Sequence, residues 1–180
     1  MAADEPDRMA ATIAPLDQAM AIITTATNEE RAGCLIGFHA QGSIDPFQYA
    51  LWISKANHTY RVGLHAEHFA VHFPSIEDHD LAELFGGETG DEIDKFELVD
   101  WEPGPGGVPL LQRLPHRLLG RRVGLFDAGG DHVCVLVEAI GGSGGPTPPL
   151  RPLRLSDATD ITPGHEAEER PEPQEPAAAD

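Results

Sequence analysis

The sequence predicts a mainly β fold, a small antiparallel barrel with one or two short helices attached to it. Roughly six or seven short stretches rich in β-branched and aromatic residues alternate with clusters of Gly, Pro, Asn and Asp, the usual pattern of strands and turns. Only one stretch has clear helical periodicity. Strands therefore do not alternate with long helices, as they do in a doubly wound parallel sheet. An antiparallel barrel accommodates many short strands with few helices.

The first half of the chain contains three predicted strands. Residues 18–27 and 32–40 are β-type runs joined by a polar turn, which predicts a hairpin. Pro46 then breaks the chain and holds Asp45 in extended geometry. Residues 47–54 form the third strand.

Two helices and a further strand follow. Asn57 is a favourable N-cap and predicts a short helix within residues 58–68. Residues 69–74 form a compact strand. Residues 75–87 form the clearest helix, because Ser75 stands at the cap position, acidic residues occupy the first turn and a glycine pair ends it.

The remaining part of the ordered chain begins with an irregular stretch and continues with two long β-type runs. Residues 96–101 are a candidate strand, and residues 102–109 form a loop rich in Gly and Pro. Residues 116–128 and 131–142 are two strands with a short glycine turn between them, which predicts a second hairpin. Residues 150–157 could add an edge strand.

The length of 180 residues suits one domain. We expect that domain to occupy residues 16–160, after a flexible N-terminal arm at residues 1–15. Residues 161–180 are acidic and rich in Pro and Ala, and a segment with so few apolar side chains cannot offset the entropy of ordering. We therefore expect a disordered tail.

The formal net charge is −18, from 30 acidic and 12 basic residues. Such a surface repels phosphate backbones and anionic lipids, so nucleic acid and membranes are poor partners. The sequence shows neither a secretory leader nor an apolar run of membrane-spanning length, which favours the cytoplasm. Cys34 and Cys134 lie in separate apolar runs, and we expect two reduced, buried thiols rather than a disulfide.

Standard catalytic motifs do not occur in the sequence. A phosphate-binding loop, a dinucleotide fingerprint and the nucleophile elbow of serine hydrolases are all absent. Three of the nine histidines, His65, His68 and His72, lie close together in the chain. They lack the spacing of a zinc site, so we expect hydrogen-bonded histidines and no metal site.

One polar segment is suited to binding an anion. Ser54 and Lys55 end the third strand, and Asn57 and Thr59 begin the helix that follows. Hydroxyls, an ammonium group and the N–H groups at a helix start could together bind a phosphate. The same residues also describe an ordinary N-cap, and their spacing does not decide between the two.

Five motifs in order resemble the flavin reductase-like family, whose members are FMN-binding split-barrel proteins. Together they cover approximately residues 20–140, and they include a Ser-Ile-Asp-Pro turn, an Asp-Lys-Phe and a Gly-Asp-His. The motifs occupy residues 37–59, 69–74, 81–96, 99–111 and 130–139.

This resemblance implies a fold and an activity. The fold would be a Greek-key split β-barrel that forms a homodimer with flavin near the subunit interface. The activity would be hydride transfer from NADH or NADPH to FMN or FAD, chemistry that belongs mainly to the two cofactors. In this family the reduced flavin often leaves to supply a separate monooxygenase.

The resemblance also implies a set of site residues. His132, from Gly-Asp-His, would position the nicotinamide. The segment before Asp-Pro would line the flavin ring, the polar segment after the third strand would reach ribityl and phosphate, and Asp-Lys-Phe would lie near the cofactor. The implied flavin contacts are Phe38, His39, Ala40, Gln41, Gly42, Ser43, Ser54, Lys55, Asn57, Thr59, Lys95 and Phe96.

One stretch and one further residue depart from the family pattern. Residues 35–41 read Leu-Ile-Gly-Phe-His-Ala-Gln, where many members have Thr-Ala-Asn-Ser-Phe-Thr-Ser, so we expect fewer side-chain hydrogen bonds to the ring. His72 stands where members usually have Asn. Two alternatives therefore stay open: a flavin-binding protein without efficient turnover, and a member of the fold that binds haem or a deazaflavin.

Overall fold

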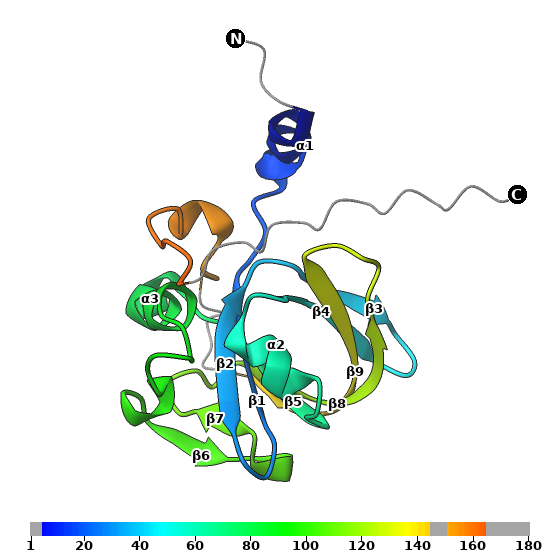
Figure 1. Ribbon diagram of the computed structural model, residues 1–180, viewed down its shortest axis with the longest axis vertical. Helices are drawn as coiled ribbons and strands as arrows, with labels where there is room; N and C mark the ends of the chain where they lie inside the picture. The colour runs from blue at the N-terminus through cyan, green and yellow to red at the C-terminus, as the bar shows by residue number, and fades with distance from the viewer. Residues whose placement is uncertain (1–4, 145–150, 165–180) are drawn as a thin grey trace, which may run out of the picture.

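The computed structural model describes residues 5–144 and 151–164, and these form one curled antiparallel sheet flanked by short helices (Figure 1). Across the sheet the strand order is β2-β1-β5-β8-β9-β4-β3. Its strands are β1 Ala21–Ala26, β2 Arg31–Ile36, β3 His39–Ser43, β4 Gln48–Ser54, β5 His68–His72, β8 Arg117–Phe126 and β9 His132–Ser143. The α-helices are α1 Glu5–Ile13, α2 His58–Gly63 and α3 His79–Gly87, and a small second sheet consists of β6 Trp101–Pro103 and β7 Pro109–Leu111.

The connection between β2 and β3 explains why the sheet curls. These two strands lie at opposite edges of the sheet, yet only Gly37 and Phe38 separate them in the chain. Three consecutive Cα–Cα steps span at most about 11 Å, so the two edges must approach each other at this point. The sheet is therefore curled into a half-barrel, and the predicted mainly β, antiparallel barrel fold is confirmed.

Strand β1 is buried on both faces. Ile23 belongs to the apolar cluster inside the barrel, with Leu51, Phe69 and Val135. Ile22 instead belongs to a second cluster outside the barrel, which α3 and the residues after it provide. Both predicted hairpins, β1–β2 and β8–β9, are present as antiparallel pairs.

The two predicted helices after β4 are also present. Asn57 occupies the N-cap position of α2 with extended backbone, although its side chain makes no capping hydrogen bond. Before α3, residues Ile76–Asp78 form a 3-10 turn, and Asp78 Oδ2 accepts hydrogen bonds from the backbone N–H and the hydroxyl of Ser75. The cap expected at Ser75 therefore exists, but it begins the 3-10 turn that precedes α3.

The strand predicted at residues 96–101 is wrong. Residues Lys95–Glu97 form a 3-10 turn, and the Asp94 carboxylate caps it by accepting the backbone N–H of Phe96. Burial of Phe96 against Phe85 then fixes this turn in the cluster outside the barrel. A strand begins only at Trp101, and residues 102–109, predicted to be a loop, contain parts of both β6 and β7.

Two other strand predictions need correction. The predicted strand 32–40 is broken at Gly37 and Phe38, since β2 pairs with β1 whereas β3 pairs with β4. The edge strand predicted at residues 150–157 is wrong for the described part, residues 151–157. That part makes two isolated bridges, Ala19 to Arg154 and Ser75 to Pro152, and then a 3-10 turn at Leu155–Asp157.

The predicted arm and tail lie partly outside the described residues. Helix α1 occupies most of the stretch predicted to be a flexible arm. Residues 165–180, most of the predicted tail, lie outside the described part of the chain, whereas Ile161 packs against the cluster that contains Met20 and Leu153. The domain limits stay predictions.

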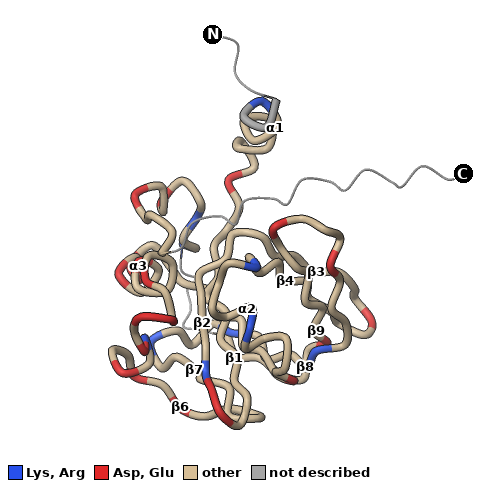
Figure 2. Tube along the Cα trace, in the orientation of Figure 1, with Lys and Arg blue, Asp and Glu red and all other residues tan. Residues whose placement is uncertain are grey.

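Acidic side chains are spread over the loops and over α3, and basic side chains are fewer (Figure 2). Cys34 is buried and Cys134 partly buried, and both are free thiols. Among the described residues, we find no helix with the length and apolar character needed to cross a membrane.

Candidate functional site

The end of β4 and the start of β9 bring two of the predicted motifs together. These strands run antiparallel, and Ser54 pairs with His132 in the last pair of the ladder. The backbone N–H of Lys55 then donates to the carbonyl of Asp131 at 2.8 Å. The polar segment after β4 and the Gly-Asp-His motif are therefore adjacent in space.

Lys55 also fixes the turn between β8 and β9. Its ammonium group donates to Asp127 Oδ1 at 2.9 Å, and the same carboxylate oxygen accepts the backbone N–H of Gly129 at 2.8 Å. Gly129 has a φ of 81°, a conformation that glycine adopts without strain. The hydrogen bond from Lys55 is the main reason that the pKa of the Asp127 carboxyl lies below its ordinary value. An anion that binds Lys55 must therefore compete with Asp127.

His132 is oriented by its neighbours on two sides. Its Nδ1 lies 2.9 Å from Asp131 Oδ1, and because the carboxylate only accepts, the imidazole donates from Nδ1. Its ring makes an edge contact with the ring of Phe38, with a centroid distance of 5.3 Å. In the neutral ring, Nε2 is then an acceptor.

A cavity of about 340 Å³ lies beside these residues. Its lining divides into two groups with different chemistry. The polar and aromatic group consists of Phe38, Trp52, Ser54, Asn57, Asp131 and His132. The apolar group consists of Met20, Leu35, Ile36, Ala158, Ile161 and Pro163, together with Leu155 at the start of the 3-10 turn Leu155–Asp157.

Residues 39–43 do not line this cavity. His39 Nε2 lies 2.8 Å from the carbonyl of Ala19, so Nε2 is the donor, and Nδ1 accepts the hydroxyl of Tyr49 at 2.7 Å. Burial lowers the pKa of His39, which keeps the imidazole neutral in this bridge. Ala40, Gln41 and Gly42 are exposed and Ser43 is half-buried, all on the edge strand β3.

Thr59 lies in the interior rather than in the cavity. It is buried in α2, and its hydroxyl is hydrogen-bonded to the thiol of Cys34. Burial raises the pKa of this thiol to about 11, so Cys34 is not a thiolate at neutral pH. Of the four residues predicted to reach a phosphate, Ser54 and Asn57 line the cavity, and Lys55 lies next to them.

Lys95 and Phe96 border a different cavity, of about 470 Å³, next to the β1–β2 turn. The ammonium group of Lys95 donates to the carbonyls of Phe85 at 3.0 Å and Gly33 at 3.3 Å, and the residue is only 4% exposed. This cavity is the larger of the two, but its buried lysine already has backbone partners. We therefore regard the cavity beside His132 as the candidate site.

The three histidines considered as metal ligands do not form one cluster in the described residues: His65 and His68 line the same pocket, but His72 does not. His72 is buried and bonded through both ring nitrogens, to the carbonyl of Ile22 and the N–H of Leu111. Within residues 5–144 and 151–164 we find no group of three or more His, Cys, Asp or Glu side chains arranged to hold a metal ion.

In a comparison with known protein families, residues 14–155 match the Flavin reductase like domain. That range covers most of the chain and contains both strands that carry the candidate site. The chain belongs to this family. The resemblance drawn from the ordered motifs is confirmed.

Curated relatives and solved structures agree with this membership. The chain is 30% identical over 122 residues to an FMN reductase (NADH) of Agrobacterium fabrum, and 29% identical over 118 residues to the reductase subunit of a stachydrine N-demethylase of Rhizobium meliloti. These alignments cover 66% and 63% of this chain, and 66% and 50% of the two relatives. An NADH:FAD oxidoreductase of Streptomyces globisporus has the same fold, with a TM-score of 0.74 and 21% identity over 88% of this chain and 94% of that one.

Several lining residues of this flavin reductase family member were missed from the sequence. Trp52 precedes the polar segment, and a signal for it existed: Leu51 and Ile53 point into the barrel, so alternation turns Trp52 outward. Met20, Leu35 and Ile161 gave no such signal. Their place in the cavity depends on how residues 151–164 fold back onto the barrel.

Proposed function

We propose that this protein is an NAD(P)H-dependent flavin reductase that transfers a hydride from NADH or NADPH to FMN or FAD. One observation carries the proposal: Ser54, Asn57, Phe38 and His132 meet around one cavity although they come from three separated segments. The proposal is also supported by the curated relatives, one an FMN reductase (NADH) and the other a reductase subunit.

The lining of the cavity fits a flavin ring. Binding sites for such ligands are mostly apolar, with a few polar groups that fix orientation. Here aromatic and aliphatic side chains supply most of the lining, and Ser54, Asn57, Asp131 and His132 supply polar atoms. A bound flavin supplies the two-electron acceptor, which no side chain can supply.

The protein's own residues then have defined tasks. Ser54 and Asn57 are suited to donate hydrogen bonds to the ribityl or phosphate oxygens. Lys55 would attract the phosphate while it exchanges partners with Asp127. His132 would hold the carboxamide of the nicotinamide through Nε2, because Asp131 fixes the ring through Nδ1. Phe38 contacts the edge of the same imidazole and would help to hold its orientation.

Residues 39–43 and 95–96 have a different part in this proposal. Both ring nitrogens of His39 are bonded, and the ammonium group of Lys95 donates to two backbone carbonyls, so we assign both residues a structural part rather than a contact with flavin. Any contact of residues 40–43 with flavin would require a second subunit, because β3 is an exposed edge of the sheet.

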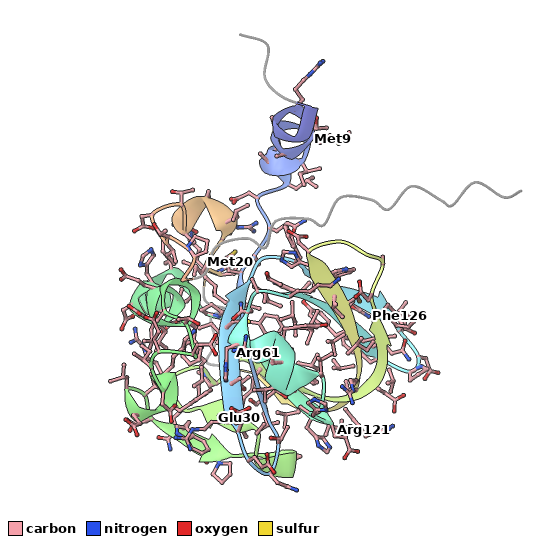
Figure 3. The ribbon with its side chains drawn as sticks, viewed as in Figure 1. Met9, Met20, Glu30, Arg61, Arg121 and Phe126 are labelled. Atoms are coloured by element: carbon pink, nitrogen blue, oxygen red, sulfur yellow. The ribbon has the colours of Figure 1, made fainter. Side chains whose placement is uncertain are left out.

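A homodimer is part of the proposal. Trp52 on β4 and Phe126 on β8 both lie opposite Cys134 of β9, so the three share the outer face of the sheet. Trp52 is 36% and Phe126 59% exposed, and Phe126 lies on the outer side of the barrel in Figure 3. A second copy on this face would cover these aromatic rings beside the cavity.

We place the enzyme in the cytoplasm and propose that it supplies reduced flavin to a monooxygenase. The two free thiols fit a reducing compartment. The stachydrine N-demethylase relative is itself named a reductase subunit, which supports a role as one component of a two-component system.

The test is anaerobic mixing of purified protein with NADH or NADPH and either FMN or FAD. The proposal expects loss of NAD(P)H absorbance and bleaching of the flavin in equal amounts, with colour returning in air. A protein that binds flavin without bleaching it would instead be a flavin-binding member without turnover. A protein that binds neither FMN nor FAD contradicts the proposal, and titration with haem and a deazaflavin then tests the remaining alternative.

A further inference from the structure

The segment after the last strand forms part of the cavity wall. Leu153 is fully buried, its N–H donates to the carbonyl of Pro74 at 2.9 Å, and its carbonyl accepts the N–H of Met20 at 2.8 Å. In Figure 1 this segment, drawn in orange, lies between α3 and the chain that enters β1. These bonds attach the segment to the chain just after β5 and just before β1.

A second set of bonds fixes the residues that follow. The Arg154 guanidinium donates to the carbonyl of Asp17 at 2.7 Å, and the Asp17 carboxylate accepts the N–H and the hydroxyl of Ser156 at 2.9 and 3.0 Å. The backbone N–H of Ser156 is the main reason that the pKa of the Asp17 carboxyl is lowered. The segment therefore holds a defined course past the cavity.

Ile161 is one of the residues that this course places against the cavity. A Cβ atom on Gly86 would lie 3.2 Å from Ile161 Cγ2 and 3.0 Å from Leu35 Cδ2, so both side chains rest on the glycine. The N–H of Gly164 donates to the carbonyl of Gly86 at 3.1 Å. Leu35, Ile161 and Met20 belong to one apolar cluster, and Met20 is labelled in Figure 3.

Part of this wall lies outside the family match, and part lies where this chain departs from the family pattern. The family match ends at residue 155, so Ala158, Ile161 and Pro163 lie beyond the matched range. Leu35 belongs to the stretch where this chain is apolar and the family pattern is polar. A Cβ on Gly37 would lie 3.3 Å from Met20 Sδ, so the apolar wall continues to the residue before Phe38.

The isoalloxazine ring of a flavin has two edges that match the two groups of lining residues. One edge is the pyrimidinedione, with carbonyl and N–H groups, and the other is a benzene ring with two methyl groups. We propose that the wall of Met20, Leu35 and Ile161 receives the dimethylbenzene edge, an inference that rests on the proposed flavin binding. Ile161 is then a specificity-determining residue for flavins that carry these methyl groups. The pyrimidinedione edge then points away from this wall, toward the polar group of lining residues, in which Ser54 and Asn57 hold the ribityl or phosphate oxygens.

The test compares FMN with 7,8-didemethyl-FMN, which differs only by the two methyl groups. Each ligand is titrated by fluorescence quenching into wild type, Ile161→Ala and Ile161→Val. At about 0.8 kcal/mol per buried methyl group, wild type binds FMN roughly tenfold more tightly than the didemethyl ligand. Ile161→Ala reduces this preference to about twofold or less, because the methyl groups lose their partner, and Ile161→Val leaves an intermediate preference.

A matched control is Ile44→Ala, which makes the same change at a side chain that is 85% exposed and outside the cavity lining. It retains the wild-type preference, and circular dichroism confirms that each variant is folded. Equal binding of both ligands by wild type overturns the inference and leaves the proposed function standing. A tenfold preference that persists in folded Ile161→Ala also overturns the inference and leaves the proposed function standing. A wild type that binds neither ligand contradicts the proposed function and this inference together.

Discussion

His72 makes the stability of the fold depend on pH in a way that can be calculated. Its Nδ1 lies 3.2 Å from the carbonyl of Ile22 and must donate, while its Nε2 lies 3.1 Å from the N–H of Leu111 and must accept. Only the neutral imidazole satisfies both partners. Burial accordingly lowers the pKa of His72 from 6.5 to about 4.

The sign of the effect follows from this lowered pKa. Between pH 6.5 and 4 the unfolded chain binds a proton at His72 and the folded chain does not, so stability falls as pH falls through this window. At 1.36 kcal/mol per pKa unit, the whole interval corresponds to about 3 kcal/mol. Above pH 6.5 the contribution is complete and constant.

The assay is urea unfolding followed by tryptophan fluorescence at several values of pH from 7.5 to 4.5, on wild type and His72→Asn. Wild type is expected to lose about 2–3 kcal/mol across this range from His72 alone. His72→Asn is less stable at pH 7.5, and its curve is flatter by that amount. His39, whose pKa burial also lowers, contributes equally to both proteins and cancels in the difference. Parallel curves for the two proteins would refute the reasoning.

Three further predictions concern residues that the family resemblance assigned to the site. His132→Ala is expected to raise KM for NAD(P)H about tenfold, since one hydrogen bond is lost, and to change the flavin Kd much less. Unchanged steady-state kinetics with both nucleotides would show that His132 does not position the nicotinamide. Lys55→Ala is expected to weaken FMN more than riboflavin in binding titrations, because only FMN carries the phosphate, and equal losses for both ligands would contradict that. Lys95→Met removes two charge-assisted hydrogen bonds and should lower the free energy of unfolding by roughly 3 kcal/mol, with FMN affinity of the folded protein unchanged. If Lys95→Met lowered FMN affinity without lowering the free energy of unfolding, Lys95 would instead belong to the binding site.

The sequence predicted the parts of the fold that local chemistry determines. The hairpins β1–β2 and β8–β9 have turn residues between two β-type runs, so each could be recognised within a short window. The break at Gly37 could not be recognised in this way. It depends on the two edges of the sheet approaching each other, which is a property of the whole barrel.

In the candidate site, too, some residues could be predicted from the sequence and others depend on the whole fold. Ser54 and His132 come together because β4 and β9 are antiparallel neighbours, and the resemblance to the family had already selected both. The orientation of Lys95 depends on carbonyls from β2 and α3, and its motif carries no information about them. Ile161 was assigned to a tail because acidic and proline residues follow it, although it packs against Gly86.

Direct hydride transfer at the cavity beside His132 is the central claim, and a deuterium isotope effect tests it most directly. Protein, FMN and NADH deuterated at the transferred position of C4 are mixed anaerobically, and flavin bleaching is timed against unlabelled NADH. We predict stoichiometric bleaching that is severalfold slower with the deuterated nucleotide, and slower again in His132→Ala. Absence of flavin bleaching with both NADH and NADPH, in a protein shown to bind FMN, would contradict the account.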